Sequence, residues 1–133
     1  MATIFTKIIN GEIPCHKIAE NDKFFAFLDI NPLQKGHTLV VPKDEVNYIF
    51  DNSDEVLSEI LLFAKGVARA IEKTVDCKRV GLMVLGLEVP HTHVHLVPIT
   101  KEGDMNLSNE HVKMTNEQLA ELAASIRNNY NCN

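Results

Sequence analysis

The sequence is short of positive charge, cysteine and long apolar runs, and each shortage excludes a class of protein. Among its 133 residues, 13 are Lys or Arg and 18 are Asp or Glu, which gives a formal net charge of −5 at pH 7. Nonspecific nucleic-acid binding depends on clusters of Lys and Arg, so this balance argues against a nucleic-acid partner. Any anionic ligand must therefore be bound locally.

The three cysteines, Cys15, Cys77 and Cys132, are odd in number and far apart. This spacing indicates neither a disulfide framework nor a Cys-x-x-Cys metal site, so we expect free thiols. No apolar run approaches the roughly 20 residues needed to cross a bilayer. The N-terminus also lacks a basic stretch followed by an apolar one. We therefore expect a cytoplasmic protein with no membrane partner.

The chain has no low-complexity tract, no Gly/Ser linker and no internal repeat that would mark a domain boundary. With 45% hydrophobic residues, a chain of this length can bury a core without metal or disulfide staples. We therefore expect one domain over residues 1–133.

Apolar periodicity predicts four strands and two helices. Strands are expected at residues 24–30, 38–41, 79–85 and 93–99. Between 54 and 73 the apolar residues recur every three or four positions, as on one face of a long helix capped by Asn52 or Ser53. Thr115 and Gln118 form a capping box that opens a C-terminal helix. Strands grouped around one long helix indicate an α+β fold with an antiparallel sheet.

Three of the six histidines, His91, His93 and His95, stand at alternate positions. Because alternate residues of a strand point to the same side, the three rings are expected in a row on one face, about 7 Å apart. The intervening Val94 and Leu96 should then point into the core.

Neighbouring rings disfavour each other's protonation, so at least one should be neutral near pH 7 and able to act as nucleophile, base or metal ligand. The triple alone leaves a metal site open, because His-x-His pairs can share a zinc ion, and His37 could complete the set. By contrast, His16 and His111 are expected to be ordinary surface or core residues.

Four blocks in order extend the pattern over most of the chain: residues 4–14 (IFTKIINGEIP), 25–32 (FAFLDINP), 36–43 (GHTLVVPK) and the His-x-His-x-His run. With these blocks the chain resembles the histidine-triad (HIT) nucleotide-binding proteins. The resemblance implies the HIT-like α+β fold, an antiparallel sheet of about five strands with one long central helix and a C-terminal helix.

The resemblance also implies an activity and a role for each histidine. The central His93 would attack the α-phosphorus of a purine nucleotide, such as a nucleoside phosphoramidate, and form a nucleotidyl-histidine that water hydrolyses. His95 would donate to the phosphate oxygens or the leaving group. His91 and His37 would orient and polarise the nucleophile through a hydrogen-bonded relay. This chemistry uses no metal and no cofactor.

For nucleotide binding, the resemblance implies that Asp29 accepts hydrogen bonds from the ribose, although by itself it reads as a turn residue or cap. Backbone N–H groups around Glu88 and Val89 would contact the phosphate. The slot for the base would be formed by apolar side chains that would otherwise be assigned to the core. These are Ile4, Phe5, Ile8, Phe27, Leu28 and Ile30.

The chain departs from the family pattern at several positions. Many relatives carry a Cys-x-x-Cys zinc site where this sequence has Thr3 and Thr6, so structural zinc is not expected. Residues 79–87, before the triad, are shorter and more apolar than the usual loop and contain no asparagine. Glu88 would repel a phosphate if its carboxylate pointed inward. Residues 101–112 form a polar loop to which the sequence assigns no role.

Two alternatives to this enzyme stay open at this stage. One is a nucleotide-binding regulatory module with weak catalysis, which the altered loop favours. The other is a metal-dependent hydrolase that uses the histidine cluster. Family members are commonly homodimers that extend the sheet across the interface, so the resemblance also implies a homodimer.

Overall fold

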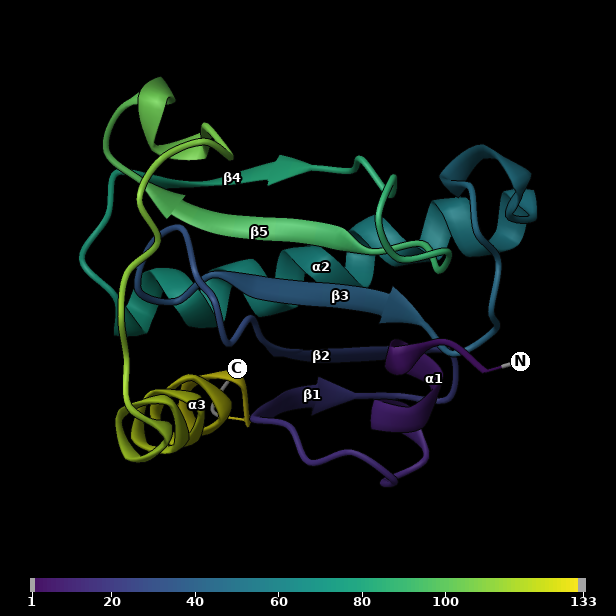
Figure 1. Cartoon of the computed structure of the whole chain (residues 1–133), viewed down its shortest axis with the longest axis horizontal. Coiled ribbons are helices and arrows are strands. Elements are labelled where there is room, and N and C mark those ends of the chain that lie inside the picture. The colour runs from purple at the N-terminus through teal and green to yellow at the C-terminus, as the bar shows by residue number, and fades with distance from the viewer. Residues whose placement is uncertain (1, 132–133) are drawn as a thin grey trace.

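The structure, a computed structural model, describes residues 2–131 and contains one five-stranded antiparallel sheet in the order β1-β2-β3-β5-β4 (Figure 1). The strands are β1 (Lys17–Glu20), β2 (Phe24–Leu28), β3 (Thr38–Pro42), β4 (Arg79–Met83) and β5 (Val94–Ile99). The helices are α1 (Ile4–Ile9), α2 (Asp54–Thr74) and α3 (Asn116–Asn131), with short 3-10 turns η1 (Ile49–Asp51) and η2 (Glu102–Met105). The predicted α+β class with an antiparallel sheet and a long helix is confirmed.

The two long helices begin where their capping residues predict. The Ser53 hydroxyl accepts a hydrogen bond from the Val56 N–H (3.2 Å), so Ser53, and not Asn52, caps α2. Ahead of α3, the Thr115 and Gln118 side chains each accept from the other residue's backbone N–H, at 3.1 and 2.9 Å. The buried Asn52 serves another purpose, since its amide donates to the Thr92 hydroxyl (3.0 Å), next to the triad.

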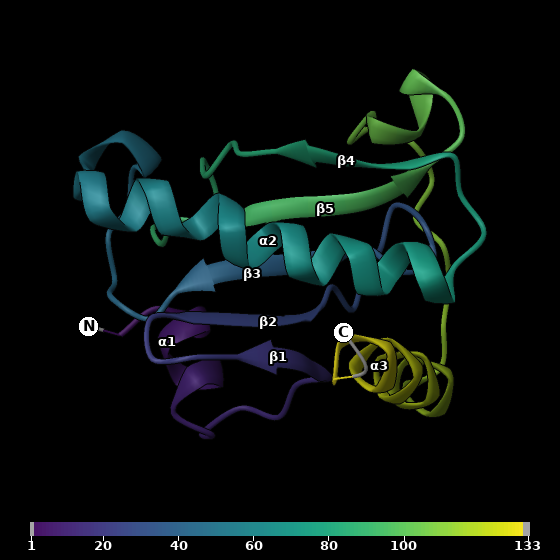
Figure 2. The ribbon, with the colours of Figure 1, turned by 180° about the vertical axis from the view of Figure 1, so that it is seen from behind.

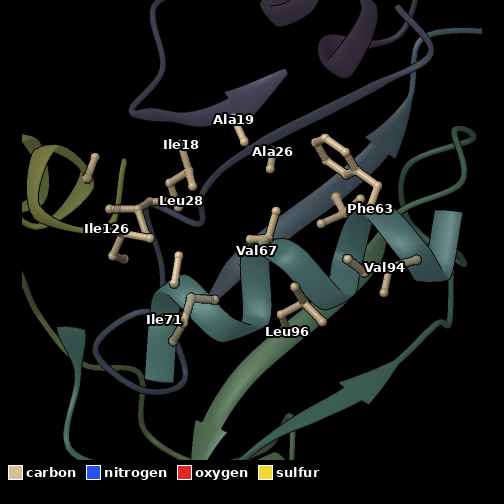
Figure 3. Packing of buried hydrophobic residues seen from close by; sticks show 14 of the residues in the cluster. Ile18, Ala19, Ala26, Leu28, Phe63, Val67, Ile71, Val94, Leu96 and Ile126 are labelled. Atoms are coloured by element: carbon tan, nitrogen blue, oxygen red, sulfur yellow. The ribbon is translucent and has the colours of Figure 1, made fainter. Parts of the chain in front are cut away.

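The sheet carries α2 on one face and α1 on the other, as the two opposite views show (Figures 1 and 2). Most of the core lies on the α2 face and includes Val67 and Ile71 of α2, Val94 and Leu96 of β5, and Ile126 of α3 (Figure 3). A smaller cluster lies under α1 and contains Phe5, Ile8, Phe25, Phe27, Leu39 and Val41. Since alternate residues of each strand face opposite sides, the same strands fill both clusters.

The sequence prediction missed β1 and α1, and each of the four predicted strands differs from the observed one at one boundary, by one residue in β3 and β5 and by two in β2 and β4. β1 and α1 are short, and α1 has only six residues, too few for a clear helical period. β2 ends at Leu28, two residues before the predicted end, because Asp29 and Ile30 already belong to the turn that precedes Pro32. β5 begins at Val94, so His91 and His93 lie in the turn before the strand.

One glycine is required to place His37. Gly36 has a φ of +100°, and a Cβ at this position would lie 3.0 Å from Val75 Cγ2 and 3.1 Å from Pro98 Cγ. Both the backbone conformation and the close packing therefore favour glycine. The turn delivers His37 directly into the start of β3, where its side chain is buried.

Cys15 and Cys77 are free thiols, as predicted, while Cys132 lies outside the described residues. Within residues 2–131, no helix has both the length and the apolar character needed to cross a membrane.

Candidate active site

The three triad histidines lie on the α1 face of the sheet, as their alternate spacing predicts, although only His95 lies within β5. The ring centroid of His95 is 5.0 Å from that of His93, and the rings of His93 and His91 both pack edge-on against Phe5 of α1. His91 lies in the turn before the strand and is completely buried. Thr92 anchors this turn, since both its N–H and its hydroxyl donate to the Val46 carbonyl at 2.7 Å. The predicted core positions of Val94 and Leu96 are confirmed.

The central ring, His93, is held by the backbone. Its Nδ1 lies 2.8 Å from the carbonyl oxygen of His91, which can only accept, so Nδ1 carries the proton. In the neutral ring, Nε2 is then left with a free lone pair, as a nucleophile requires. Phe5 packs edge-on against the ring, with the two centroids 5.0 Å apart.

A chain of three hydrogen-bonding groups fixes the protons of His37 and His95. The Leu33 N–H donates to His37 Nδ1 (3.0 Å), which places the His37 proton on Nε2. That Nε2–H can donate to Nδ1 of His95, 3.0 Å away, and so leaves the His95 proton on Nε2. His95 lines the cleft beside His93, so this chain presents a donor next to the nucleophile.

His37 therefore contacts His95 and not the nucleophile, which divides the predicted relay into two branches. Burial lowers the pKa of His37 to about 4, and burial together with the neighbouring rings lowers the pKa of His95 to about 4. Desolvation also lowers the pKa of His91. The three supporting rings are consequently neutral near pH 7, as the hydrogen-bond pattern requires.

Asp29 lies at the end of β2, next to the His37–His95 pair. One carboxylate oxygen accepts from the Asn31 N–H (2.8 Å), and the other is 3.6 Å from His37 Nε2. Burial raises the pKa of this carboxyl. A partly exposed acceptor here, beside the reactive rings, suits a ligand hydroxyl.

The reactive rings open into a cleft of about 430 Å³ lined by nine residues. Asn31, Leu85 and Leu107 were not assigned to the site from the sequence, whereas Gly86 and Leu87 belong to the stretch around Glu88 whose backbone N–H groups were expected to contact the phosphate. Glu88, His93 and His95 were assigned to the site from the sequence, and all three lie on the wall of the cleft. The ninth residue is His111.

His111 corrects the expectation that it is an ordinary surface or core histidine. Its Nδ1 lies 2.7 Å from the Asn31 carbonyl oxygen, and the next residue, Val112, donates its N–H to the Pro32 carbonyl (2.9 Å). These bonds bring part of the polar loop 101–112 to the mouth of the cleft. His111 lies well after the triad in the sequence, at the end of the loop, and nothing in the loop's composition indicates this position.

The residues expected to form the base slot divide between the two faces of the sheet. Phe5, Ile8 and Phe27 lie together on the α1 face, the face of His93 and His95, and Val89 packs against them. Leu28 does not, since it belongs to the core between the sheet and the long helices (Figure 3). It follows Phe27 in the same strand and so points the opposite way. Ile4 and Ile30 are 49% and 73% exposed.

Asp29, His37 and His95 bring three potential metal-binding atoms within 4.8 Å of one another. The hydrogen-bond pattern does not suit a metal ion there. The Leu33 N–H points at His37 Nδ1, so the His37 proton must occupy Nε2, the nitrogen that a metal would need. This argues against the metal-dependent alternative.

Thr3 and Thr6, which stand where many HIT proteins carry zinc-binding cysteines, form hydrogen bonds instead. The Thr3 hydroxyl is 2.9 Å from His91 Nδ1, and Glu45 accepts from the Thr3 N–H (2.7 Å) and the Thr6 hydroxyl (2.6 Å). Glu45 was not assigned to the site, and its sequence position gives no signal of this contact.

Known proteins resemble this chain in sequence and in fold. The HIT domain family model matches residues 10–102. The chain is 39% identical to the adenosine 5′-monophosphoramidase of Schizosaccharomyces pombe over 103 residues, covering 77% of each chain. It is 42% identical to an uncharacterised HIT-like protein of Methanocaldococcus jannaschii over 111 residues, 76% of this chain and 81% of that one.

Among solved structures, a HIT-like protein of Bartonella henselae, described as involved in cell-cycle regulation, superimposes with a TM-score of 0.82. The two are 30% identical, and the match covers 96% of this chain and 95% of that one. The chain therefore belongs to the HIT family and has its fold.

Acid should destabilise this site in a defined window. Above about pH 6.5 the rings of His37 and His95 are neutral in both the folded and the unfolded chain. Between that pH and about 4, the unfolded chain binds protons on these rings that the folded chain refuses, so the free energy of unfolding falls as the pH falls. The raised pKa of Asp29 has the opposite sign and offsets part of this loss.

Urea unfolding midpoints at several pH values between 7 and 4 measure this dependence. The His95→Gln variant should show a shallower decrease than the wild type across that window. An equally steep decrease in the variant would mean that the His95 ring does not resist protonation in the folded state.

Proposed function

We propose that this chain is a nucleoside phosphoramidase that cleaves the bond at the α-phosphate of a purine nucleotide through a covalent intermediate on His93. The observation that carries the proposal is the hydrogen bond between Nδ1 of His93 and the His91 carbonyl. In the neutral ring this bond leaves Nε2 with the free lone pair, and His93 lines the cleft together with His95, whose proton lies on Nε2. The relatives named as adenosine 5′-monophosphoramidases support the reaction class.

In the first step, the lone pair of His93 Nε2 forms a bond to phosphorus while the P–N bond of the phosphoramidate breaks. The electron pair of that bond goes to the departing amine, which takes a proton from water in the cleft, while the Nε2–H of His95 donates a hydrogen bond to a phosphate oxygen. The positive charge that forms on the His93 ring is stabilised by the His91 carbonyl at Nδ1.

In the second step, water attacks phosphorus, and the electron pair of the His93–phosphorus bond returns to Nε2 of the ring. The proton released by this water neutralises the hydroxide left by the first step, so both histidines end as they began. A covalent step of this kind divides one difficult displacement into two easier ones.

The groups around the cleft suit the other parts of a nucleotide. Asp29 would accept from the ribose hydroxyls, with one oxygen turned toward the reactive rings. The aromatic rings of Phe5 and Phe27, whose centroids are 5.8 Å apart, would contact the base together with Ile8. Ile4, Ile30 and Val89 would complete the slot, and backbone N–H groups around Glu88 would contact the phosphate. Leu28 is left out, because it faces the opposite core.

The covalent step is tested by intact mass of the metal-free protein after brief reaction with adenosine 5′-phosphoramidate. We expect an acid-labile mass gain of one adenylyl group in the wild type. The His93→Ala variant should lack the adduct and turnover and should still bind AMP, since the other binding residues remain. His16→Ala, which removes a ring bonded to Asn116 away from the cleft, is the matched control and should behave as wild type.

Glu88 on the cleft wall gives one specific reason to retain a second function, a nucleotide-binding module with weak catalysis. AMP binding with no adduct and no product release in the wild type would contradict the enzyme proposal and support this module. Full activity in His93→Ala would contradict both the nucleophile and the covalent step.

We also propose that the active form is a homodimer. β4 is an edge strand of the sheet, and the large apolar side chains on and after it are exposed: Leu82 (47%), Leu85 (50%) and Leu87 (95%). Tyr48 and Phe50 add a further exposed aromatic pair. Exposed edges and apolar patches of this kind are typical of interfaces.

Light scattering coupled to size exclusion should give twice the chain mass for the wild type at about 50 µM. Leu82→Lys should shift it toward the monomer with the fold retained. Ala124→Lys, at an exposed position of α3, is the control and should stay dimeric. A monomeric wild type would refute the dimer.

The extent of the domain over residues 1–133 and the cytoplasmic location stay predictions from the sequence.

A further inference from the structure

His91 is completely buried, and both its ring nitrogens are engaged. Nε2 lies 2.7 Å from the Pro42 carbonyl oxygen, which can only accept, so Nε2 carries the proton. Nδ1 of the neutral ring must then accept, and its partner is the Thr3 hydroxyl at 2.9 Å. The tautomer of His91 is thus the reverse of that of His93.

A second layer of contacts directs the Thr3 hydroxyl hydrogen. The Thr6 N–H lies 3.2 Å from Thr3 Oγ1 and donates to it, so the Thr3 hydroxyl uses its own hydrogen on His91. The Thr6 hydroxyl in turn donates to Glu45 Oε1. Glu45 also accepts the Thr3 N–H, a bond that lowers the pKa of this carboxyl and keeps it an acceptor. Two longer contacts also lie in this group, from Thr3 Oγ1 to Thr6 Oγ1 (3.4 Å) and from Thr6 Oγ1 to His91 Nδ1 (3.5 Å). The shorter contacts assign the Thr3 hydrogen to His91 and the Thr6 hydrogen to Glu45.

This group joins segments that are far apart in the sequence. Thr3 and Thr6 belong to the start of α1, Glu45 follows β3, and His91 lies in the turn before β5. Fixing both nitrogens of the His91 ring fixes the residue whose carbonyl binds Nδ1 of His93. The contacts at the start of α1 therefore affect the position of His93 Nε2, because they hold the His91 ring and the His91 backbone carbonyl holds the His93 ring.

We propose that Thr3, Thr6 and Glu45 form a positioning clasp that holds the His91 ring in place and, through the His91 carbonyl, keeps the proton of the neutral His93 ring on Nδ1 and its Nε2 directed into the cleft. The clasp does not touch substrate, and its effect on catalysis rests on the proposed function of His93. Its effect on the ring tautomers is independent of that proposed function.

Long-range ¹H–¹⁵N spectra of protein labelled with ¹⁵N-histidine report which nitrogen of each ring carries the proton. The wild type should show the Nε2–H form for His91 and the Nδ1–H form for His93. A wild-type His91 in the Nδ1–H form would overturn the proposal. This test needs no substitution, so it also holds if Thr3→Val does not fold.

Thr3→Val removes the hydroxyl at nearly constant volume. We expect the His93 signals to move toward a mixture of tautomers and kcat for adenosine 5′-phosphoramidate to fall about 10- to 100-fold, as for a small misplacement of a reacting group. KM should change little, because the nucleotide contacts remain. Thr3→Ser, which restores the hydroxyl, should recover most of kcat. Wild-type kcat and tautomers in Thr3→Val would refute the clasp.

Variants of Glu45 separate positioning from charge. Glu45→Gln keeps an acceptor oxygen for the Thr3 N–H and the Thr6 hydroxyl and should retain most of kcat, whereas Glu45→Ala should resemble Thr3→Val. A large loss in Glu45→Gln equal to that in Glu45→Ala would contradict a positioning role. Thr74→Val is the matched control, since its hydroxyl bonds only Ala70 and Asn129 at the end of α2.

The failure of this proposal can be told apart from the failure of the proposed function. A wild type that forms no adduct but shows the expected tautomers, changed in Thr3→Val, would refute the enzyme and leave the clasp. An active wild type whose tautomers are the same in Thr3→Val would refute the clasp and leave the enzyme.

Discussion

The chemistry of this protein depends on backbone groups that decide where the protons of buried histidines lie. A carbonyl oxygen can only accept and an amide N–H can only donate, so each contact of this kind assigns a proton to one ring nitrogen. The His91 carbonyl assigns it to Nδ1 of His93, the Pro42 carbonyl to Nε2 of His91, and the Leu33 N–H to Nε2 of His37. The reactive nitrogens follow from these three bonds.

This arrangement explains why the histidines are both buried and uncharged. Burial disfavours the imidazolium form, and a hydrogen-bond pattern complete for the neutral rings offers no acceptor for an extra proton. The cost of burying polar rings is offset because the side-chain polar atoms buried among the described residues all have partners. The site shares the α1 face of the sheet with the smaller apolar cluster, while the larger cluster joins the opposite face to α2 and α3.

Much of the fold could be predicted from sequence because its signals are local. The α2 and α3 boundaries depend on capping residues within four positions of each helix start, and Val94 and Leu96 follow from strand alternation. The triad turn could not be predicted, because the bonds of Thr92 to Val46 and of His91 to Pro42 join residues more than 40 positions apart.

The site was predicted only in part, because some of its residues are marked by local motifs and others by tertiary contacts alone. The triad and Asp29 stand out by motif and resemblance, whereas Glu45 and His111 acquire their places only through tertiary contacts. Leu28 was misplaced because the family block was treated as a unit, although neighbouring strand residues face opposite sides. His37 was expected to act on His93 through hydrogen bonds, but its Nε2 lies next to Nδ1 of His95 instead.

The central claim is that the α-phosphate passes through a bond to His93. The most direct measurement is the stereochemical course at phosphorus, followed with a P-chiral adenosine phosphorothioamidate hydrolysed in ¹⁸O-labelled water. Two successive displacements, first by His93 and then by water, predict overall retention of configuration. Inversion would mean a single direct attack by water and would contradict the account.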